Sequence, residues 1–268
     1  MNQIKIITYC HGRESVLQVF VNNLLALVPV PKVIICGSGE DNCKSIVEAA
    51  GFEYIEYKNF PVGEKANFCC SHAFEFDVTH YMITGSDDLI SQRLWDFYLN
   101  YKGSYCGLKD LYFFCTESRK LIYWKGYLEE KRYFGYPIGS CLLISRDLME
   151  EVDFKPYKNE SKWPREQDAH ESIREFQDIE LFGVNEVGIS VDLKGGGITR
   201  FDLWPNSQYC SLEELKVDMD IYNIVNQIQV EEKSKEKSIS YLKEKRAMIE
   251  KSYCHLAKEF KTKPNQPN

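Results

Sequence analysis

Two adjacent carboxylates, Asp87 and Asp88, follow an apolar run that begins at Tyr81. Such a run is typical of a buried strand, and side chains at the carboxyl end of a strand in an open α/β sheet face the crevice where ligands bind. Neighbouring acids raise each other's pKa unless a cation lies between them. Mg²⁺ or Mn²⁺ at a nucleotide is usually held by one or two carboxylates together with the substrate phosphates. The pair therefore predicts a metal–diphosphate site, although the same residues could instead cap a helix that starts at Leu89.

Strand and helix signals alternate through the first 90 residues and would position this pair. Apolar residues spaced from Val16 to Leu27 predict an amphipathic helix, which Pro29 and Pro31 end. The predicted strands are 4–9, 32–36, 52–57 and 79–84, and the predicted helices are 14–28, 42–50 and 64–76. This alternation predicts an α/β fold with a mainly parallel sheet flanked by helices.

The rest of the chain changes character twice. Residues 103–127 are rich in aromatic and β-favouring residues and predict antiparallel strands. Further elements are expected as strands at 141–144 and 188–193, a helix at 146–152 and helical spacing within 163–182. From about residue 212 the sequence is charged and helical without a sustained heptad. We therefore expect one domain over 1–210, in two halves of about 1–100 and 101–210, and a helical extension over 211–268.

Composition limits the class of protein. The 268 residues are 44% hydrophobic and 27% charged, which is an ordinary soluble balance, and no apolar run approaches the roughly 20 residues of a membrane helix. The first residues lack the features of a signal peptide, so we expect a cytoplasmic protein without an integral membrane segment. A net charge of −7 argues against indiscriminate binding of nucleic acid. The ten cysteines form no pair of CxxC motifs, so most are expected to be small core residues.

Four short segments lie at the ends of predicted strands or at the start of a predicted helix. They are Thr8–Arg13, Cys36–Asp41, Gly63–Asn67 and Gly85–Asp88. In an open α/β sheet these positions share the crevice side. Each segment alone is a weak signal, but their order along the chain is fairly specific.

The ordered set resembles the family 2 glycosyltransferases and their relatives of the GT-A fold. The likeness covers about residues 4–90 well and 133–182 more weakly, and it does not cover the tail. Many of these relatives carry a further acid two or three positions before the last Asp, where this chain has Gly85 and Ser86. The resemblance implies a nucleotide-diphosphate sugar as donor, most simply a UDP-sugar, and Mn²⁺ or Mg²⁺ as cofactor.

The resemblance also assigns roles in donor binding. Thr8 and Tyr9 would line the base pocket with Arg13 nearby, and Asp41 would accept hydrogen bonds from the base. By themselves, Arg13 could equally pair with Glu14 and Asp41 could be an ordinary turn residue.

The remaining donor-side roles fall on the third and fourth segments. Lys65 and Asn67 would contact base, ribose or phosphate, unless Lys65 is a solvated helix charge. Asp87 would lie near the ribose and the metal, and Asp88 would bind the metal.

A sugar transfer with inversion needs a base for the acceptor hydroxyl. Residues 163–168 resemble the family's acidic helix start, so Asp168 is the base candidate, with Glu166 in reserve and His170 as a further option. The alternative is an acid that offsets the helix macrodipole. Lys194, which precedes a run of three glycines, could neutralise the departing diphosphate, and Asp192 or His170 could complete the metal shell.

These expectations combine into a metal-dependent glycosyltransferase, hexosyl or pentosyl, acting on a hydroxyl of a glycan, a protein or a modified DNA base. A basic patch around Lys125, Lys131 and Arg132 is conceivable, as is a homo-oligomer formed through the C-terminal helices. The alternatives are a nucleotidyltransferase and a non-catalytic nucleotide-sugar-binding module. A nucleotidyltransferase would normally show a glycine-rich, basic loop after the first strand, whereas this chain has only Gly12 there.

Overall fold

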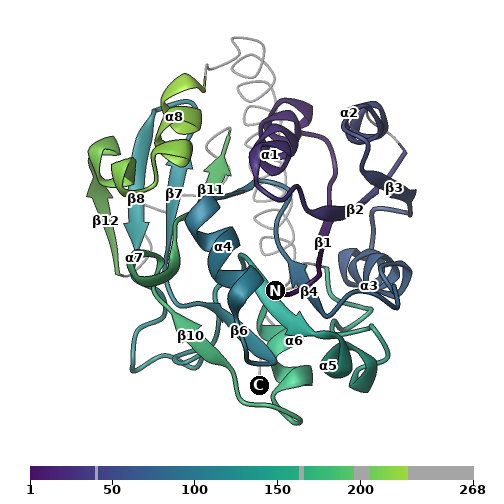
Figure 1. The fold of residues 1–268 in the computed structure, drawn as a ribbon. Helices are drawn as coiled ribbons and strands as arrows, with labels where there is room; N and C mark the ends of the chain where they lie inside the picture. Colours follow the sequence, from purple (N-terminus) through teal and green to yellow (C-terminus); the bar gives the residue numbers. More distant parts are fainter. Residues whose placement is uncertain (40–41, 163–165, 196–205, 229–268) are drawn as a thin grey trace, which may run out of the picture.

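The computed structural model describes residues 1–39, 42–162, 166–195 and 206–228, which form two β-sheets with helices packed on them (Figure 1). In spatial order the larger, seven-stranded sheet contains β10 (Glu180–Phe182), β6 (Tyr105–Leu108), β9 (Leu142–Ser145), β4 (His80–Ile83), β1 (Ile4–Tyr9), β2 (Lys32–Gly37) and β3 (Glu53–Glu56). Strands β4, β1, β2 and β3 run parallel, β10 runs parallel to β6, and β9 is antiparallel to both of its neighbours. The predicted α/β class with a mainly parallel sheet is confirmed.

The smaller sheet has five strands and is connected to the larger one by the short segment between β4 and β5. Its order is β12 (Ser207–Cys210), β8 (Lys120–Trp124), β7 (Leu111–Cys115), β11 (Ser190–Lys194) and β5 (Asp88–Ile90). Only residues 84–87 separate β4 of the first sheet from β5 of the second. Strand β11 pairs antiparallel with β5, in a register that sets Asp192 opposite Asp88. The predicted acidic pair therefore lies at the junction of the two sheets.

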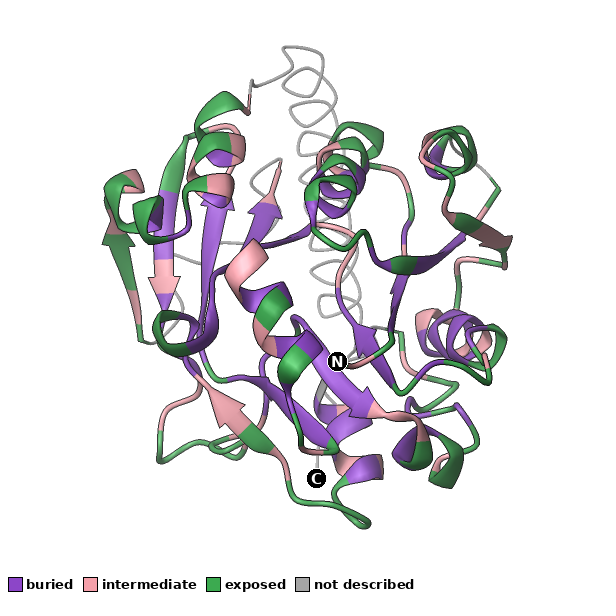
Figure 2. Cartoon of the chain, viewed as in Figure 1, coloured by how far each residue is buried: buried purple, intermediate pink, exposed green. Residues whose placement is uncertain are grey.

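Helices cover both faces of the larger sheet because its inner strands carry apolar side chains on both sides. One face packs against α3 (Val62–His72), α5 (Arg146–Glu151) and α6 (Glu166–Ile173). The other face packs against α1 (Glu14–Ala26), α2 (Cys43–Ala49) and α4 (Gln92–Asn100), and α4 lies between the two sheets (Figure 1). A short helix, α7 (Val184–Val187), leads into β11. Figure 2 shows the inner strands buried, whereas β3, β10 and β12 at the sheet edges and the outer sides of these helices are exposed or intermediate.

The helix-cap interpretation of the acidic pair is wrong. Leu89 and Ile90 continue as strand β5, and the following helix, α4, begins only after Ser91. The Ser91 hydroxyl accepts the hydrogen bond from the backbone N–H of Leu94 and is thus the cap. The carboxylates of Asp87 and Asp88 therefore do not cap this helix.

The described part of the tail belongs to the core of the domain. A 3₁₀ helix (Leu212–Val217) and α8 (Met219–Gln227) bury Leu215, Ile221 and Val225 completely. Residues 229–268, most of the predicted extension, lie outside the described residues, so its role in self-association stays a prediction.

The buried carboxylate of Asp218 helps to fasten this tail segment. Asp218 accepts a hydrogen bond from the backbone N–H of Ile189 at 2.8 Å and from Nε of Arg93 at 2.8 Å.

In the described part of the chain, none of the helices combines the length and the apolar character that crossing a membrane requires.

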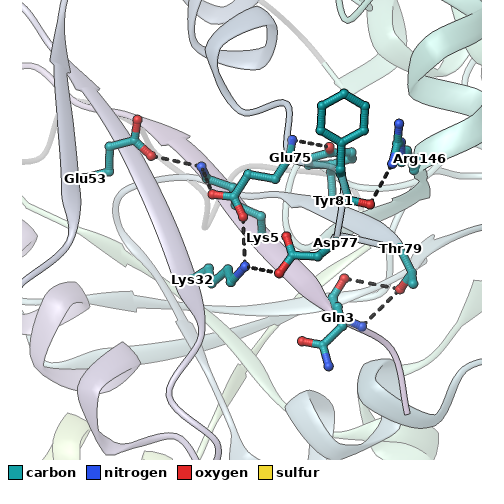
Figure 3. A network of polar contacts seen from close by, with 10 residues as sticks. Gln3, Lys5, Lys32, Glu53, Glu75, Asp77, Thr79, Tyr81 and Arg146 are labelled. Atoms are coloured by element: carbon teal, nitrogen blue, oxygen red, sulfur yellow. Dashed lines mark hydrogen bonds and ion pairs between the residues drawn. The ribbon is translucent and has the colours of Figure 1, made fainter.

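A charged network ties the amino-terminal ends of the parallel strands together (Figure 3). Lys5 on β1 is only 3% exposed, and its ammonium donates to Glu53 at 2.9 Å and Glu75 at 2.8 Å. Lys32 on β2 donates to the other oxygen of Glu75 and to Asp77, both at 2.9 Å. The hydrogen bonds from Lys5 and Lys32 lower the pKa of Glu75 below its usual value of 4.5. Glu75 is thus the shared acceptor that joins β1 to β2.

Replacing this shared acceptor should cost stability in a pH-dependent way. Because one third of the Glu75 side chain is exposed, we expect Glu75→Gln to lower the free energy of unfolding at pH 7 by about 1 kcal/mol, less than a fully buried pair would lose. A lowered folded-state pKa stabilises the protein above the unfolded-state value and ceases to do so as pH falls through the folded value. The difference from wild type should therefore shrink below about pH 4. Urea denaturation at both pH values measures it, with Glu151→Gln, an exposed acid on α5, as control. An equal loss at both pH values would contradict an ionic origin.

Candidate metal and nucleotide site

The turn between β4 and β5 is shaped around the Asp88 carboxylate. Asp88 is 3% exposed, and its Oδ2 accepts hydrogen bonds from the backbone N–H of Gly85 at 2.7 Å and the hydroxyl of Thr84 at 3.1 Å. A Cβ at Gly85 would lie 2.7 Å from Oδ1 of Asp87 and 2.9 Å from Oδ2 of Asp88. The absence of a side chain at Gly85 thus lets two carboxylates approach the same backbone segment.

Asp192 brings a third carboxylate from β11. It is only 9% exposed, and one side-chain oxygen from each of Asp87, Asp88 and Asp192 lies within 4.8 Å of the others. The backbone N–H of Leu193 donates to the carbonyl of Asp87 at 2.8 Å, which holds the strand against the turn. Oδ1 of Asp192 is buried and has no hydrogen-bond partner among the residues that the structure describes. A buried anionic oxygen without a partner is costly unless a cation compensates it.

Two basic side chains contact two of the three carboxylates, Asp87 and Asp192. The Lys194 ammonium lies 2.5 Å from Oδ2 of Asp192 and 3.5 Å from Oδ2 of Asp87. Arg13 donates to Oδ2 of Asp87 at 2.7 Å and to the carbonyl of Leu193 at 2.6 Å. Arg13 therefore pairs with Asp87 rather than with its neighbour Glu14. Three carboxylates against two cations leave one excess negative charge.

The electrostatics of the cluster reflect this imbalance. Burial, and then repulsion by Asp87, raises the pKa of Asp88 to about 6 and that of Asp192 well above its usual value. Burial also disfavours the charged form of Asp87, but the charges of Lys194 and Arg13 outweigh it and lower its pKa. Burial disfavours the charged Lys194, yet Asp192 and Asp87 raise its pKa above the usual value. An added cation would relieve the repulsion that raises the two pKa values.

The donor set fits a hard divalent cation. Carboxylate oxygens are the ligands that Mg²⁺ and Mn²⁺ prefer, and these ions are often bound by few protein ligands plus substrate phosphates. Asp87, Asp88 and Asp192 offer such oxygens, and the orphaned oxygen of Asp192 is an independent sign that the cluster lacks positive charge. His170, the other candidate for the metal shell, is not part of this group.

The first-strand residues lie beside the cluster with less direct roles. Thr8 is fully buried at the end of β1, and its hydroxyl has no partner within the described ranges. Tyr9 is half-buried and packs on the core of the α3 face. Asp41, the expected base contact, falls outside the described residues. Donor contacts by these residues stay predictions.

Lys65 is not a solvated helix charge, because only 1% of it is exposed. Its ammonium donates to the carbonyl of Cys10 at 2.6 Å and to the amide oxygen of Asn59 at 3.3 Å. The lysine thus supports from beneath the loop that carries Arg13.

The Gly63–Asn67 segment holds a neighbouring stretch of chain in place. The Asn67 side chain donates to the carbonyl of Tyr157 at 2.7 Å and to Asn159 at 2.8 Å, and it accepts from the Tyr157 N–H at 2.9 Å. A Cβ at Gly63 would lie 2.1 Å from the carbonyl of Lys158. Both amide hydrogens of Asn67 are therefore donated within the protein. The segment fixes residues 157–161, which lead toward α6.

Helix α6 carries the base candidates. Asp168 is half-buried and accepts a hydrogen bond from the hydroxyl of Ser161 at 3.3 Å, while Glu166 opens the helix. His170 is 5% exposed and lies 3.0 Å from the Tyr105 hydroxyl. Burial, and then the charge of Arg174, lowers the pKa of His170 to about 4, so it is neutral at pH 7. Asp168 is partly open to solvent, whereas His170 is buried.

Sequence reasoning named Asp192 only as an option and missed how Arg13 and Lys194 are used. A local signal was present, because Asp192 and Lys194 lie two residues apart in an apolar strand and so share one face. The sequence alone does not show which strand pairs with this one and brings its acids beside Asp192. The register of β11 on β5 supplies this information.

No protein-family model matches the chain, and a search of curated proteins finds no match. Among solved structures, the chain is similar to glucosyl-3-phosphoglycerate synthase from Mycobacterium tuberculosis, solved with Mn²⁺ and UDP, at 11% identity and a TM-score of 0.43 over 85% of this chain and 77% of that one. It is also similar to 4-diphosphocytidyl-2C-methyl-D-erythritol synthase from Anaerococcus prevotii, at 13% identity and a TM-score of 0.46 over 68% and 87%. A third, the inositol-1-phosphate CTP transferase from T. maritima, matches at 8% identity and a TM-score of 0.47 over 85% and 96%. At these scores the similarity assigns no activity, which must be argued from the site.

Removing the charge of Asp88 should weaken metal binding while the fold survives. Asp88→Asn keeps an oxygen for Gly85 and Thr84 but lowers the negative charge of the cluster, so we expect Mn²⁺ affinity to fall by on the order of 100-fold. Electron paramagnetic resonance of free Mn²⁺ measures this, with Glu151→Gln as the control that should bind like wild type. Unchanged Mn²⁺ affinity in a folded Asp88→Asn variant would remove Asp88 from the metal site.

Proposed function

We propose that this chain is a metal-dependent glycosyltransferase that moves a sugar from a nucleotide-diphosphate sugar to an acceptor hydroxyl. The observation that carries the proposal is the convergence of Asp87, Asp88 and Asp192 at the carboxyl edge of the parallel strands. This edge is where open α/β sheets bind their ligands. A buried cluster with excess negative charge suits a divalent ion, and the ion in turn suits a diphosphate.

The chain's own residues have distinct tasks in this proposal. Asp87, Asp88 and Asp192 would hold Mn²⁺ or Mg²⁺, which supplies charge stabilisation for the diphosphate as it leaves. Arg13 keeps Asp87 in place, and its loop rests on Lys65. Thr8, Tyr9, Asn67 and Asp41 remain candidates for base and ribose contacts. The donor we favour is a UDP-sugar.

The transfer itself exchanges one bond for another. The bond between the anomeric carbon and the diphosphate oxygen breaks, and the acceptor oxygen forms the new bond from the opposite face. Asp168 would take the hydroxyl proton as that bond forms, with Glu166 as the reserve base. This sequence gives inversion at the anomeric carbon.

An aromatic surface beside α6, formed by the partly exposed Tyr127, Tyr133 and Tyr136, is the acceptor candidate. These rings and the buried ring of His170 behind them follow one another at centroid distances of 5.7, 5.4 and 4.5 Å. Tyr127 also shares a hydrogen bond with Gln167, the residue before Asp168. Flat rings next to the proposed base suit the apolar face of a sugar or a base of DNA. The acceptor is therefore proposed to be a hydroxyl of a glycan, a protein or a modified DNA base.

The geometry favours glycosyl transfer over nucleotidyl transfer. A nucleotidyltransferase must cradle a triphosphate with free donors in the loop after its first strand. Here only four residues, 10–13, join β1 to α1, and the Arg13 guanidinium donates to Asp87 and Leu193.

A donor panel tests the function. With Mn²⁺ and UDP-, GDP- and CDP-sugars, we expect release of the nucleoside diphosphate. Pyrophosphate release from a nucleoside triphosphate and a sugar phosphate would instead indicate a nucleotidyltransferase. Donor binding without turnover, even with acceptor extracts, would indicate a binding module.

Loss of the base should separate binding from chemistry. Asp168→Asn should leave the donor Kd unchanged and lower turnover by about 10²–10⁴-fold, because the acceptor hydroxyl then keeps its proton. Glu175→Gln, an exposed acid just beyond α6, is the matched control and should turn over like wild type. Wild-type turnover in Asp168→Asn would place the base elsewhere.

A further inference from the structure

The Lys194 ammonium contacts carboxylates that a bound cation would also contact. They are two of the three, Asp87 and Asp192, at 3.5 and 2.5 Å. The third, Asp88, is bound from the other side by Thr84 and the Gly85 backbone. The lysine side chain is still 26% exposed, so it has room to leave toward solvent. The cluster thus already holds a cation that is attached to the protein.

This cation satisfies the cluster incompletely. Oδ1 of Asp192 stays without a partner among the described residues although Oδ2 is paired with Lys194. One ammonium carries a single charge, and here it contacts Asp87 and Asp192 without bonding all three carboxylates. A divalent ion has the charge and the coordination number to do so.

The two cations are difficult to accommodate together. An ion bonded at about 2.1 Å to Oδ2 of Asp192, the oxygen that Lys194 contacts, would lie within about 5 Å of an ammonium that kept its present position. Like charges at that distance in a buried site repel by several kcal/mol before any screening. The carboxylates that attract one cation are the same carboxylates that attract the other.

We propose, on the basis of the proposed function, that Lys194 and the divalent ion exchange at this cluster: the ammonium holds Asp87 and Asp192 until the ion binds, and then moves off them. With the ion in place and Lys194 and Arg13 nearby, the cluster gains a net positive charge. The diphosphate of the donor restores the balance and is the partner to which the displaced ammonium turns. Lys194 is thereby a positioning residue before donor binding and a diphosphate ligand after it.

The exchange predicts three states of Lys194 in the full-length protein. Pulse labelling with an amine reagent, read by peptide mass spectrometry, should show low reactivity without metal, at least about threefold higher reactivity with Mn²⁺ alone, and low reactivity again with Mn²⁺ and UDP. Lys120, an exposed lysine on β8, is the internal control and should stay constant. Equal labelling of Lys194 with and without Mn²⁺, in protein that binds Mn²⁺ by paramagnetic resonance, would overturn the exchange and leave the proposed function standing. Failure to bind Mn²⁺ at all would overturn both.

Substitutions of Lys194 and Arg13 distinguish competition between the lysine and the metal ion from a general loss of positive charge. Lys194→Gln should bind Mn²⁺ about tenfold more tightly than wild type without nucleotide and bind UDP·Mn²⁺ more weakly. Arg13→Gln removes the same charge from Asp87 but does not touch Asp192, so its effect on Mn²⁺ should be smaller. Lys194→Arg, which keeps the charge, should restore wild-type Mn²⁺ affinity and guards against a folding defect. Weaker Mn²⁺ binding in a folded Lys194→Gln variant, or an equal gain in Arg13→Gln, would contradict the exchange.

Discussion

The site depends on an uncompensated negative charge buried where two sheets meet. Asp87, Asp88 and Asp192 come from a turn and from two strands, and within the described residues Lys194 and Arg13 pair with Asp87 and Asp192. Repulsion of this kind would open the junction if it were not opposed by strand pairing on both sides. The backbone of β11 is bonded to β5 and β7, and Leu193 is bonded to the turn itself. The scaffold is therefore arranged to hold carboxylates together against their own repulsion, which is a common feature of functional sites.

The surrounding elements serve to fix the few backbone segments that carry these charges. Gly85 allows the turn to fold onto two carboxylates, and Lys65 supports the Arg13 loop from within the core. Asn67 and Gly63 fasten the chain that precedes α6, so the base candidate and the acid cluster are tied to the same helix, α3. A motif that resembled direct nucleotide contacts thus also acts as a structural clamp. Positioning by buried hydrogen bonds is what a site needs if small displacements cost activity.

The sequence predicts what is local and periodic. Strand β1 has the predicted bounds of 4–9, and the predicted first helix, 14–28, appears as Glu14–Ala26, because apolar spacing and the prolines are local signals. The alternative reading, a helix that starts at Leu89, is wrong about the start and the cap: the helix in this stretch, α4, begins at Gln92 and is capped by Ser91. The pairing of β11 with β5 brings together residues far apart in the chain. Nothing in a single sequence encodes such a register visibly, so Asp192 could be suspected but not placed.

The two ends of the parallel sheet show why burial, more than charge count, identifies the functional end. At the amino-terminal end, Lys5 and Lys32 face the three carboxylates of Glu53, Glu75 and Asp77, the same numbers as in the acid cluster. Those carboxylates are 33–71% exposed, so water compensates the excess charge and the network is complete without a ligand. At the carboxyl end, the side chains of Asp87 and Asp192 are 17% and 13% exposed and Asp88 is 3% exposed, and one oxygen of Asp192 is left without a partner in the described chain. Water compensates less of the excess charge there, which favours the binding of a cation.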